Sequence, residues 1–320
     1  MPDVPLHQPH DKLFRATFSN PANTAAFLRH HLGAGGLHLP AVDWNSLTPV
    51  PGSFIEPEMA GFEADLLFSA KVEGLENLLY ILWEHQRSED ALMGLRLLTY
   101  MTRIWHKQQG GRKPSPRLAP IVPIVLAQDK NHWKTSVRFH DLFDFPKEGR
   151  EMLRGCTPDF GFRLLQLADI PYEDIRGTPE GILTLRSLKA APLDELMRDP
   201  VWDNRIITGV SREAVERFFR YVLDANVDKE VFRARVQKLS PQSLTSLAMT
   251  LAETFRQEGR QEGEIVSRRQ ALFDVLETRF HRVPRGLGET IFTISDLPTL
   301  EKLLRTAVTC PDLETFASSL

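Results

Sequence analysis

The chain has 320 residues, of which 42% are hydrophobic and 25% are charged, and its formal net charge is −3. This hydrophobic content supplies the core of one large domain or of two ordinary ones, and it excludes wholesale disorder. The slightly acidic balance counts against constitutive tight binding of DNA, although a carboxylate cluster that recruits divalent cations offsets phosphate repulsion.

The cysteines and the apolar segments indicate where the protein resides. Cys156 and Cys310 are the only two cysteines, they are far apart, and no zinc-type spacing occurs. They predict reduced thiols and no disulfide framework. Residues 1–12 have no signal-peptide pattern, and no run approaches the roughly 18 apolar residues of a membrane helix. We therefore expect a cytoplasmic protein without a membrane span.

The first part of the chain predicts helix and then loop. A helical pattern begins at Asp11 and continues through Leu13, Phe14 and Phe18. Aspartate before an apolar-periodic run is typical of a helix N-cap. Residues 33–57 are rich in glycine and proline and predict a loop with at most one short edge strand.

Two strand-like segments follow, joined by a short polar turn. Residues 62–71 alternate between apolar and polar positions, as a half-buried strand does, whereas residues 78–83 are apolar at every position. A strand that is apolar on both faces belongs in the middle of a sheet with helices on each side. Residues 73–77 between the segments contain glycine and predict a hairpin connection.

Polar residues lie where these strands end. Glu84, His85 and Gln86 follow the apolar strand, and because successive side chains alternate, Glu84 and Gln86 share one face. Asp65 lies in the first strand, so a hairpin brings Asp65 and Glu84 together at one end of the sheet. Two carboxylates held by rigid strands form an oxygen-rich site of the kind that binds Mg²⁺. Such an ion polarises a phosphodiester and activates a bound water.

A purely structural role is the alternative for each of these residues. Asp65 by itself is typical of an ordinary carboxylate at a strand end. Glu84 directly follows six apolar residues, and an unpaired carboxylate buried in a sheet is costly, a cost that a metal ion offsets. Gln86 can orient a water or contact a phosphate oxygen, but it is neither a base at neutral pH nor a positive charge.

Residues 91–109 predict an amphipathic helix after the second strand. Arg96 lies on a side of this helix that is either solvated or faces phosphate groups. The loop at residues 110–116 contains Arg112 and Lys113 and is either an exposed linker or a contact to the DNA backbone. The predicted buried stripe of the helix consists of Leu92, Leu95, Leu98, Met101, Thr102 and Trp105.

Further strands and helices are predicted beyond this loop. Residues 121–126 predict a buried strand parallel to residues 78–83, because a helix joins the two. Residues 160–167 predict another strand, and residues 179–222 have a helical pattern.

The last part of the chain is predicted to be helical as well. The triplet Gln-Glu-Gly occurs at residues 257–259 and 261–263, which indicates a weak or bent helix, a hinge, or a close helix crossing. Residues 268–280 are amphipathic, and two short helices follow at residues 287–294 and 297–307. Dimerisation or docking of a partner is the role that we expect for this region.

Several segments together resemble a known family. Asp65, a hairpin and then Glu84-x-Gln86 are similar to the core of the PD-(D/E)XK nucleases, with glutamine where the usual lysine stands. More narrowly, the chain resembles the bacterial Rpn family of recombination-promoting nucleases, in which this glutamine also occurs. That resemblance is carried by five segments in the expected order, at residues 10–14 (HDKLF), 64–68 (ADLLF), 84–88 (EHQRS), 95–100 (LRLLTY) and 120–126 (PIVPIVL).

The resemblance implies roles for individual residues. In related cores the main-chain carbonyl at the position of His85 is a third protein ligand of the metal, beside Asp65 and Glu84. Asp11 matches a first helix that can contribute an acidic group to the site, and the helix-cap alternative is compatible with this role. Arg96 matches an arginine of the family helix, which favours a contact to nucleic acid.

The sequence therefore predicts an α/β fold of the PD-(D/E)XK restriction-endonuclease-like type, with a mixed central sheet flanked by helices. We expect a nuclease domain over residues 1–200, a helical extension over 201–258 and a small C-terminal helical region over 259–320. The last of these regions is expected to support a homodimer.

The predicted function is a Mg²⁺-dependent DNA endonuclease linked to recombination of mobile DNA, with Asp65, Glu84, Gln86 and Asp11 in its site. The alternative is a catalytically silent DNA-binding or protein-interaction module on the same fold. The acidic balance keeps it open, as does the strand end Ala127-Gln128-Asp129, where relatives tend to carry a Tyr-His-Gly-like sequence. A strand-transferring transposase is not supported, because no three-carboxylate arrangement of the RNase H type is found.

Overall fold

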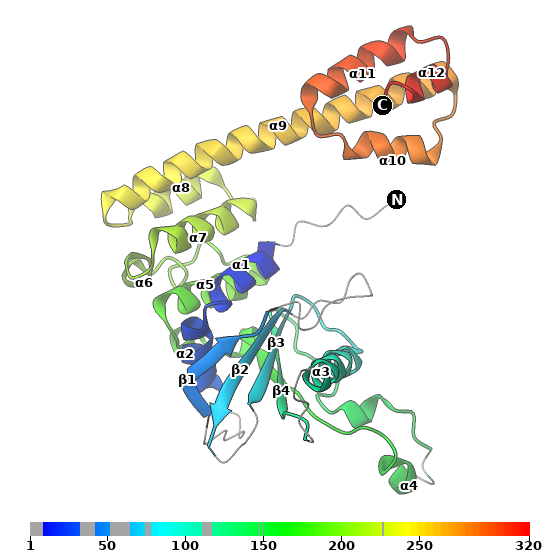
Figure 1. Ribbon diagram of the computed structural model, residues 1–320. Helices are drawn as coiled ribbons and strands as arrows, with labels where there is room; N and C mark the ends of the chain where they lie inside the picture. The colour runs from blue at the N-terminus through cyan, green and yellow to red at the C-terminus, as the bar shows by residue number, and fades with distance from the viewer. Residues whose placement is uncertain are drawn as a thin grey trace. The chain divides into compact units, whose positions relative to one another are not determined.

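The computed structural model describes residues 9–32, 42–51, 65–73, 78–110, 117–146, 148, 150–225 and 227–320 (Figure 1). The described residues form two compact units, one within Gln8–Ser246 and one within Leu247–Leu320. The expected boundary at residues 200/201 falls inside the first unit, and the one at 258/259 falls within a helix of the second. The three-part division into domains therefore stays a prediction.

A five-stranded mixed sheet forms the centre of the first unit, with the strands side by side in chain order. β2 pairs antiparallel with β1 and β3, whereas β4 pairs parallel with β3 and β5. The antiparallel pairing predicted for the hairpin strands and the predicted parallel neighbour of residues 78–83 are therefore confirmed, and the fold is α/β. Residues 74–77 of the predicted hairpin connection lie outside the described residues. The strands are β1 (Val42–Pro49), β2 (Leu66–Val72), β3 (Leu79–Gln86), β4 (Ile121–Ala127) and β5 (Arg163–Gln166).

β3 is the middle strand, and both of its faces are covered. Trp83 points to helices α1 (Pro9–Phe18) and α2 (Pro21–His31), where its ring lies 5.0 Å from Phe14, 4.8 Å from Phe18 and 5.6 Å from Phe27. Leu82 points to the opposite face and packs in one cluster with residues of α3 (Met93–Gln109). This two-sided burial explains why the strand is apolar at every position.

Helix α3 is where predicted, but the stripe it buries differs from the predicted one. Leu92 and Leu95 were expected to be buried, and their exposed fractions are 57% and 48%. The helix begins at Met93 and turns a neighbouring stripe toward the sheet, made of Met93, Gly94, Leu97, Tyr100, Met101 and Ile104. The sequence has leucines on both stripes, so periodicity could not choose between them.

Further helices complete the first unit. Polar side chains cap their N-termini: Thr178 caps α5 and Ser211 caps α7. The α-helices are α4 (Arg150–Arg154), α5 (Pro179–Ala190), α6 (Asn204–Thr208), α7 (Arg212–Asp224) and α8 (Lys229–Gln237). The 3₁₀-helices are η3 (Phe139–Leu142), η4 (Leu167–Asp169), η5 (Tyr172–Asp174) and η6 (Ala191–Leu193).

The second unit is helical, as predicted. Gly259 and Gly263 lie inside one continuous helix, α9, and a Cβ built on either glycine meets no atom within 4 Å. Among the described residues there is therefore no close helix crossing at the Gln-Glu-Gly triplets. The helices are α9 (Gln242–Phe280), α10 (Arg285–Thr293), α11 (Leu297–Thr309) and α12 (Leu313–Ala317).

The core of the second unit is formed by the C-terminal half of α9 and by the three shorter helices. Leu272, Leu276, Ile291, Leu300 and Phe316 are fully buried there. Arg279 donates hydrogen bonds to the carbonyl oxygens of Ala307 (2.6 Å) and Cys310 (2.9 Å), which satisfies the end of α11. No helix in the described part of the chain combines the length and the apolar character needed to cross a bilayer.

Candidate active site

The two predicted carboxylates meet at one end of the β2–β3 pair. Leu66 pairs with Trp83, so Asp65, the residue before β2, lies opposite Glu84. The backbone N–H of Asp65 donates a hydrogen bond to Glu84 Oε1 (3.1 Å), and the backbone N–H of His85 donates one to Asp65 Oδ2 (2.6 Å). Each carboxylate is thus fixed by the backbone beside the other. The predicted convergence of Asp65 and Glu84 is present, although Asp65 precedes the strand in which it was expected.

Both carboxylates are deeply buried, and this alters their acidity. Only 1% of the Glu84 side chain and 9% of the Asp65 side chain are exposed. Burial, and next the charge of nearby Asp65, raises the pKa of Glu84 to about 7. Burial also raises the pKa of Asp65, against the hydrogen bond from His85 and the charge of Arg15. The site therefore concentrates negative charge in a place that disfavours it.

Two arginines neutralise this charge, one from each neighbouring helix. Arg96 of α3 donates from Nη2 to Glu84 Oε2 (2.9 Å) and from Nη1 to Asp90 Oδ2 (3.4 Å). Arg15 of α1 contacts Asp65 Oδ1 from Nε (3.1 Å) and Nη2 (3.0 Å). Sequence reasoning proposed Arg96 as a nucleic-acid contact and missed both pairs. Arg15 follows Asp11 by one helical turn, the only signal that it faces the same site.

His85 connects the sheet to α1 on the other face. Its Nδ1–H donates to Asp11 Oδ1 (2.8 Å), and its ring stacks on Phe14 at 5.1 Å. Burial acts to raise the pKa of Asp11, but the hydrogen bond and charge of His85 outweigh it, and the pKa is lowered. Asp11 lies inside the first turn of α1, so it does not precede the helix as an N-cap does. Its carboxylate instead fixes the imidazole of His85.

His10 forms a further set of polar contacts next to the Asp11–His85 hydrogen bond, and the sequence did not predict it. Nδ1 of His10 lies 2.7 Å from the Tyr221 hydroxyl and 3.2 Å from Nε2 of buried Gln128. Gln128 Nε2 also donates to the Leu188 carbonyl (2.9 Å), and its backbone N–H donates to the Gln86 carbonyl (2.8 Å). The strand end at Ala127-Gln128-Asp129 therefore links β3 and β4 to the helices through the side chain and backbone of Gln128.

The donor set fits a divalent cation only in part. Among the described residues, no three His, Cys, Asp or Glu side chains lie together as metal ligands. The predicted ligand set has only two such side chains, Asp65 and Glu84, beside the main-chain carbonyl of His85. Two carboxylates are enough for Mg²⁺, which is usually bound by one or two of them and keeps several waters. Both carboxylates are nearly fully buried side by side, and hard oxygen ligands of this kind are the ones that Mg²⁺ prefers. The residues therefore fit this group, provided that the cation takes over the charge neutralisation that Arg15 and Arg96 supply in the structure.

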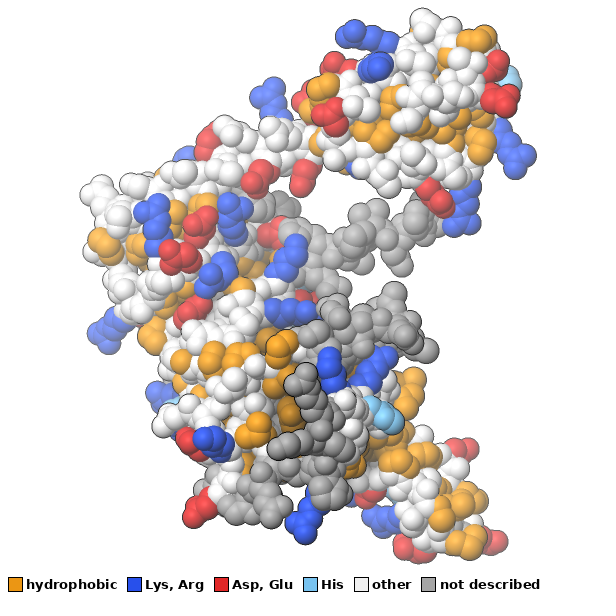
Figure 2. Space-filling model, in the orientation of Figure 1, with side chains coloured by type: hydrophobic (Ala, Val, Ile, Leu, Met, Phe, Trp, Pro, Cys, Tyr) orange, Lys and Arg blue, Asp and Glu red, His pale blue; other side chains and the backbone are white. Residues whose placement is uncertain are grey.

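The structure does not describe the other two residues that were predicted to contact nucleic acid. Arg112 and Lys113 lie outside the described residues, so their role stays a prediction. On the face drawn in Figure 2, basic and acidic side chains are interspersed over α7 and α8 among the residues shown in colour. That mixture agrees with the net charge of −3.

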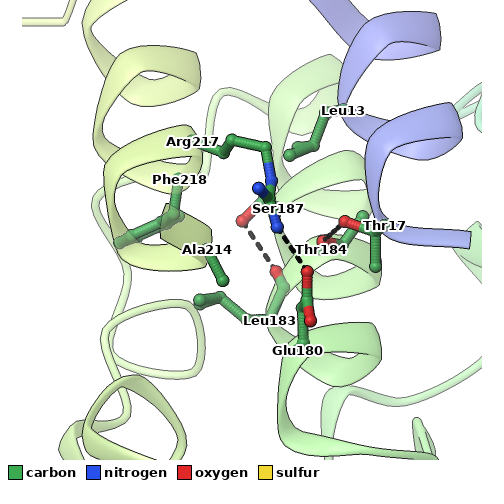
Figure 3. Close-up of a pocket in the computed structure, with 9 residues that line it drawn as sticks. All are labelled: Leu13, Thr17, Glu180, Leu183, Thr184, Ser187, Ala214, Arg217 and Phe218. Carbon is green, nitrogen blue, oxygen red and sulfur yellow. Dashed lines mark hydrogen bonds and ion pairs between the residues drawn. The ribbon is translucent and has the colours of Figure 1, made fainter. Parts of the chain in front are cut away.

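A small recess between α1, α5 and α7 is a packing joint (Figure 3). The Arg217 guanidinium donates to Glu180 Oε1 (2.6 Å) across it, and the hydroxyls of Thr17 and Thr184 hydrogen-bond at 2.8 Å. Its walls leave no space for the centre of a water molecule. The recess therefore binds the helices together and does not serve as a ligand site.

The fold and the site define an α/β protein with a buried carboxylate pair at the end of its central strands. Residues 8–207, more than half of the chain, match the family described as "Putative transposase, YhgA-like". The chain belongs to this family, which includes the Rpn recombination-promoting nucleases.

Three relatives from Escherichia coli (strain K12) show how far the similarity extends. The chain is 25% identical to the inactive recombination-promoting nuclease-like protein RpnE over 317 residues, 93% of this chain and 99% of that protein. It is 26% identical to the recombination-promoting nuclease RpnA over 258 residues, 79% and 85% of the two chains. It is 28% identical to the recombination-promoting nuclease RpnC over 157 residues, 49% and 51% of the two chains. No solved structure matches the chain.

Proposed function

We propose that this chain is a Mg²⁺-dependent DNA endonuclease with a site of the PD-(D/E)XK type, linked to DNA recombination. The observation that carries the proposal is the interlocked pair of buried carboxylates, Asp65 and Glu84. An apolar residue at either position would avoid the cost of burying a charge, so a chemical role accounts for them better than stability does. The names of RpnA and RpnC support the same class of activity.

The residues of the site have distinct tasks in this proposal. Asp65, Glu84 and the His85 carbonyl would hold the cation, which when bound polarises a phosphodiester and lowers the pKa of a bound water. Gln86 positions a water or a phosphate oxygen through its amide. Asp11 keeps the His85 ring, and with it the end of β3, in one orientation through the 2.8 Å hydrogen bond. Arg96, Arg112 and Lys113 contact phosphate groups of the DNA.

The proposal extends to assembly and location. The C-terminal helices α9 to α12 would support a homodimer, and the protein would act in the cytoplasm. Both cysteines are free, Cys156 exposed and Cys310 buried, which suits a reducing compartment.

A catalytically silent DNA-binding or interaction module is the second candidate. Two observations favour it: arginines already neutralise both carboxylates, and the relative with the most complete coverage of those described above carries the name inactive. In this case Asp65 and Glu84 would be buried ion pairs without a cation, and no divalent ion would saturate the site.

Nicking of supercoiled plasmid in Mg²⁺ separates the two candidates. For a nuclease, Glu84→Gln and Asp65→Asn each reduce the nicking rate by at least about 100-fold, because each removes a group that stabilises the transition state. Glu180→Gln is the matched control, since Glu180 also pairs with an arginine but lies at the joint of α5 and α7. Nicking by both site variants at the rate of the control would exclude the proposed site.

A further inference from the structure

Arg96 has an environment that its ion pair does not fully explain. Its guanidinium reaches from α3 into the site, where it contacts Glu84 and Asp90 through two different terminal nitrogens. The third nitrogen, Nε, is buried and has no hydrogen-bond partner among the described residues. An unpaired buried donor costs free energy, so the present pairing leaves part of the guanidinium unsatisfied.

The two partners of this ion pair differ in their freedom to move. Glu84 is 1% exposed and is also held by the backbone of Asp65, whereas 25% of the Arg96 side chain is exposed. Asp90, the other partner of Arg96, is 30% exposed. The carboxylate therefore stays in the site, and the arginine is the group that can leave it toward solvent.

A divalent cation and the Arg96 guanidinium compete for the Glu84 carboxylate. Both carry positive charge and repel each other at contact distance inside a protein, where the dielectric constant is low. A phosphate group is the natural new partner for a displaced arginine, because the fork of Nε and a terminal nitrogen matches two phosphate oxygens. The nitrogen that is unpaired in the structure would be used in that fork.

We propose that Arg96 is an exchangeable counter-ion, which neutralises Glu84 in the metal-free site and moves to the DNA backbone when a divalent cation binds. This inference rests on the proposed function and adds a thermodynamic consequence. Arg96 competes with the metal in free protein, and DNA removes the competitor, so metal and DNA each strengthen binding of the other. Such coupling is reciprocal by linkage.

Calorimetric titration with Ca²⁺ at pH 9 tests the exchange, because at this pH a proton does not take the place of the guanidinium on Glu84. Without DNA, Arg96→Gln binds Ca²⁺ about 10-fold more tightly than the wild type, a difference of about 1.4 kcal/mol. A short DNA duplex, checked to be intact, tightens Ca²⁺ binding several-fold in the wild type. The same duplex has a smaller effect in Arg96→Gln.

Two further variants control for charge and for folding. Arg138→Gln removes an arginine that pairs with Asp159 at 2.6 Å outside the site, and it keeps the wild-type affinity and the wild-type effect of DNA. Arg96→Lys keeps the charge without the fork and gives an intermediate affinity. Tryptophan fluorescence confirms that each variant is folded.

The outcomes separate this inference from the proposed function. If the wild type binds Ca²⁺ and nicks plasmid while Arg96→Gln binds Ca²⁺ equally or more weakly, the exchange is wrong and the nuclease assignment stands. Ca²⁺ binding at the site is defined as the binding that Glu84→Gln abolishes. If neither the wild type nor Arg96→Gln shows such binding, the exchange and the nuclease assignment are both wrong. Tighter binding by Arg96→Gln together with a weakened DNA effect supports the exchange.

Discussion

The two units of this protein bury different kinds of side chain. In the described part of the chain, the buried polar residues all lie between Thr17 and Lys189, and they include Glu84, His85 and Gln128. The described core of Leu247–Leu320 is made of apolar side chains and Cys310. Buried polar groups cost free energy unless they are paired. The first unit therefore carries features that stability alone does not require, and the described residues of the second unit include no buried polar side chain.

The largest expected effect on the free energy of unfolding comes from truncating one buried leucine in the core of each unit. Leu276→Ala in the second unit and Leu82→Ala in the first each remove a fully buried side chain and cost about 2–5 kcal/mol. All five tryptophans lie between residues 44 and 202, so fluorescence reports on the first unit. In urea, Leu276→Ala should shift only the circular-dichroism transition, whereas Leu82→Ala should shift the fluorescence. A common shift in both signals would show that the units unfold as one.

The next effect is the pH dependence that Glu84 gives to the first unit. Its pKa is about 7 in the folded chain and near 4.5 otherwise, so between these values the folded state keeps a proton that the unfolded state has lost. Stability therefore falls as the pH rises from 4.5 to 7. Urea unfolding followed by fluorescence at several pH values should show this loss in the wild type relative to Glu84→Gln. Parallel stability curves for the two proteins would mean that Glu84 titrates normally.

His10 should contribute a smaller dependence of opposite sign. Burial, and then the charges of Arg87 and His85, lower the pKa of His10 to about 4, against Asp11 and Asp224. The unfolded chain takes up the proton near pH 6.5 and the folded chain does not, so stability rises as the pH rises from 4 to 6.5.

Because His10 is only about half buried, its contribution to the free energy of unfolding should rise by about 1–2 kcal/mol over this pH range, after allowance for solvent screening. The difference in unfolding free energy between wild type and His10→Asn over this range measures it. The expectation fails if that difference is independent of pH.

The smallest effect, and a stabilising one, is expected in the second unit. Gly259 and Gly263 lie within α9 with open space around each Cβ position. Replacing either with alanine removes a helix penalty of about 1 kcal/mol or less. Gly288→Ala is the contrasting variant, because its Cβ would lie 3.0 Å from the Phe273 ring. The midpoint of thermal unfolding, followed by circular dichroism, should rise for Gly259→Ala and Gly263→Ala and not for Gly288→Ala.

Local patterns in the sequence determined the strands and the meeting of the two carboxylates. Alternation over the first strand, an all-apolar second strand and a polar turn are sufficient for a hairpin, and a hairpin puts Asp65 opposite Glu84. The helix between residues 91 and 109 likewise makes β3 and β4 parallel. These features depend on neighbours in the chain, which is why periodicity reveals them.

Only the tertiary structure decided which helix faces and which charges complete the site. Leucines occur on two stripes of α3, and packing against Leu82 selected the stripe that also turns Arg96 toward Glu84. The pairs Arg15–Asp65 and His10–Tyr221 join residues 50 and 211 positions apart. A sequence pattern of period two or 3.6 carries no information about such distant partners, because their contact depends on how whole elements pack.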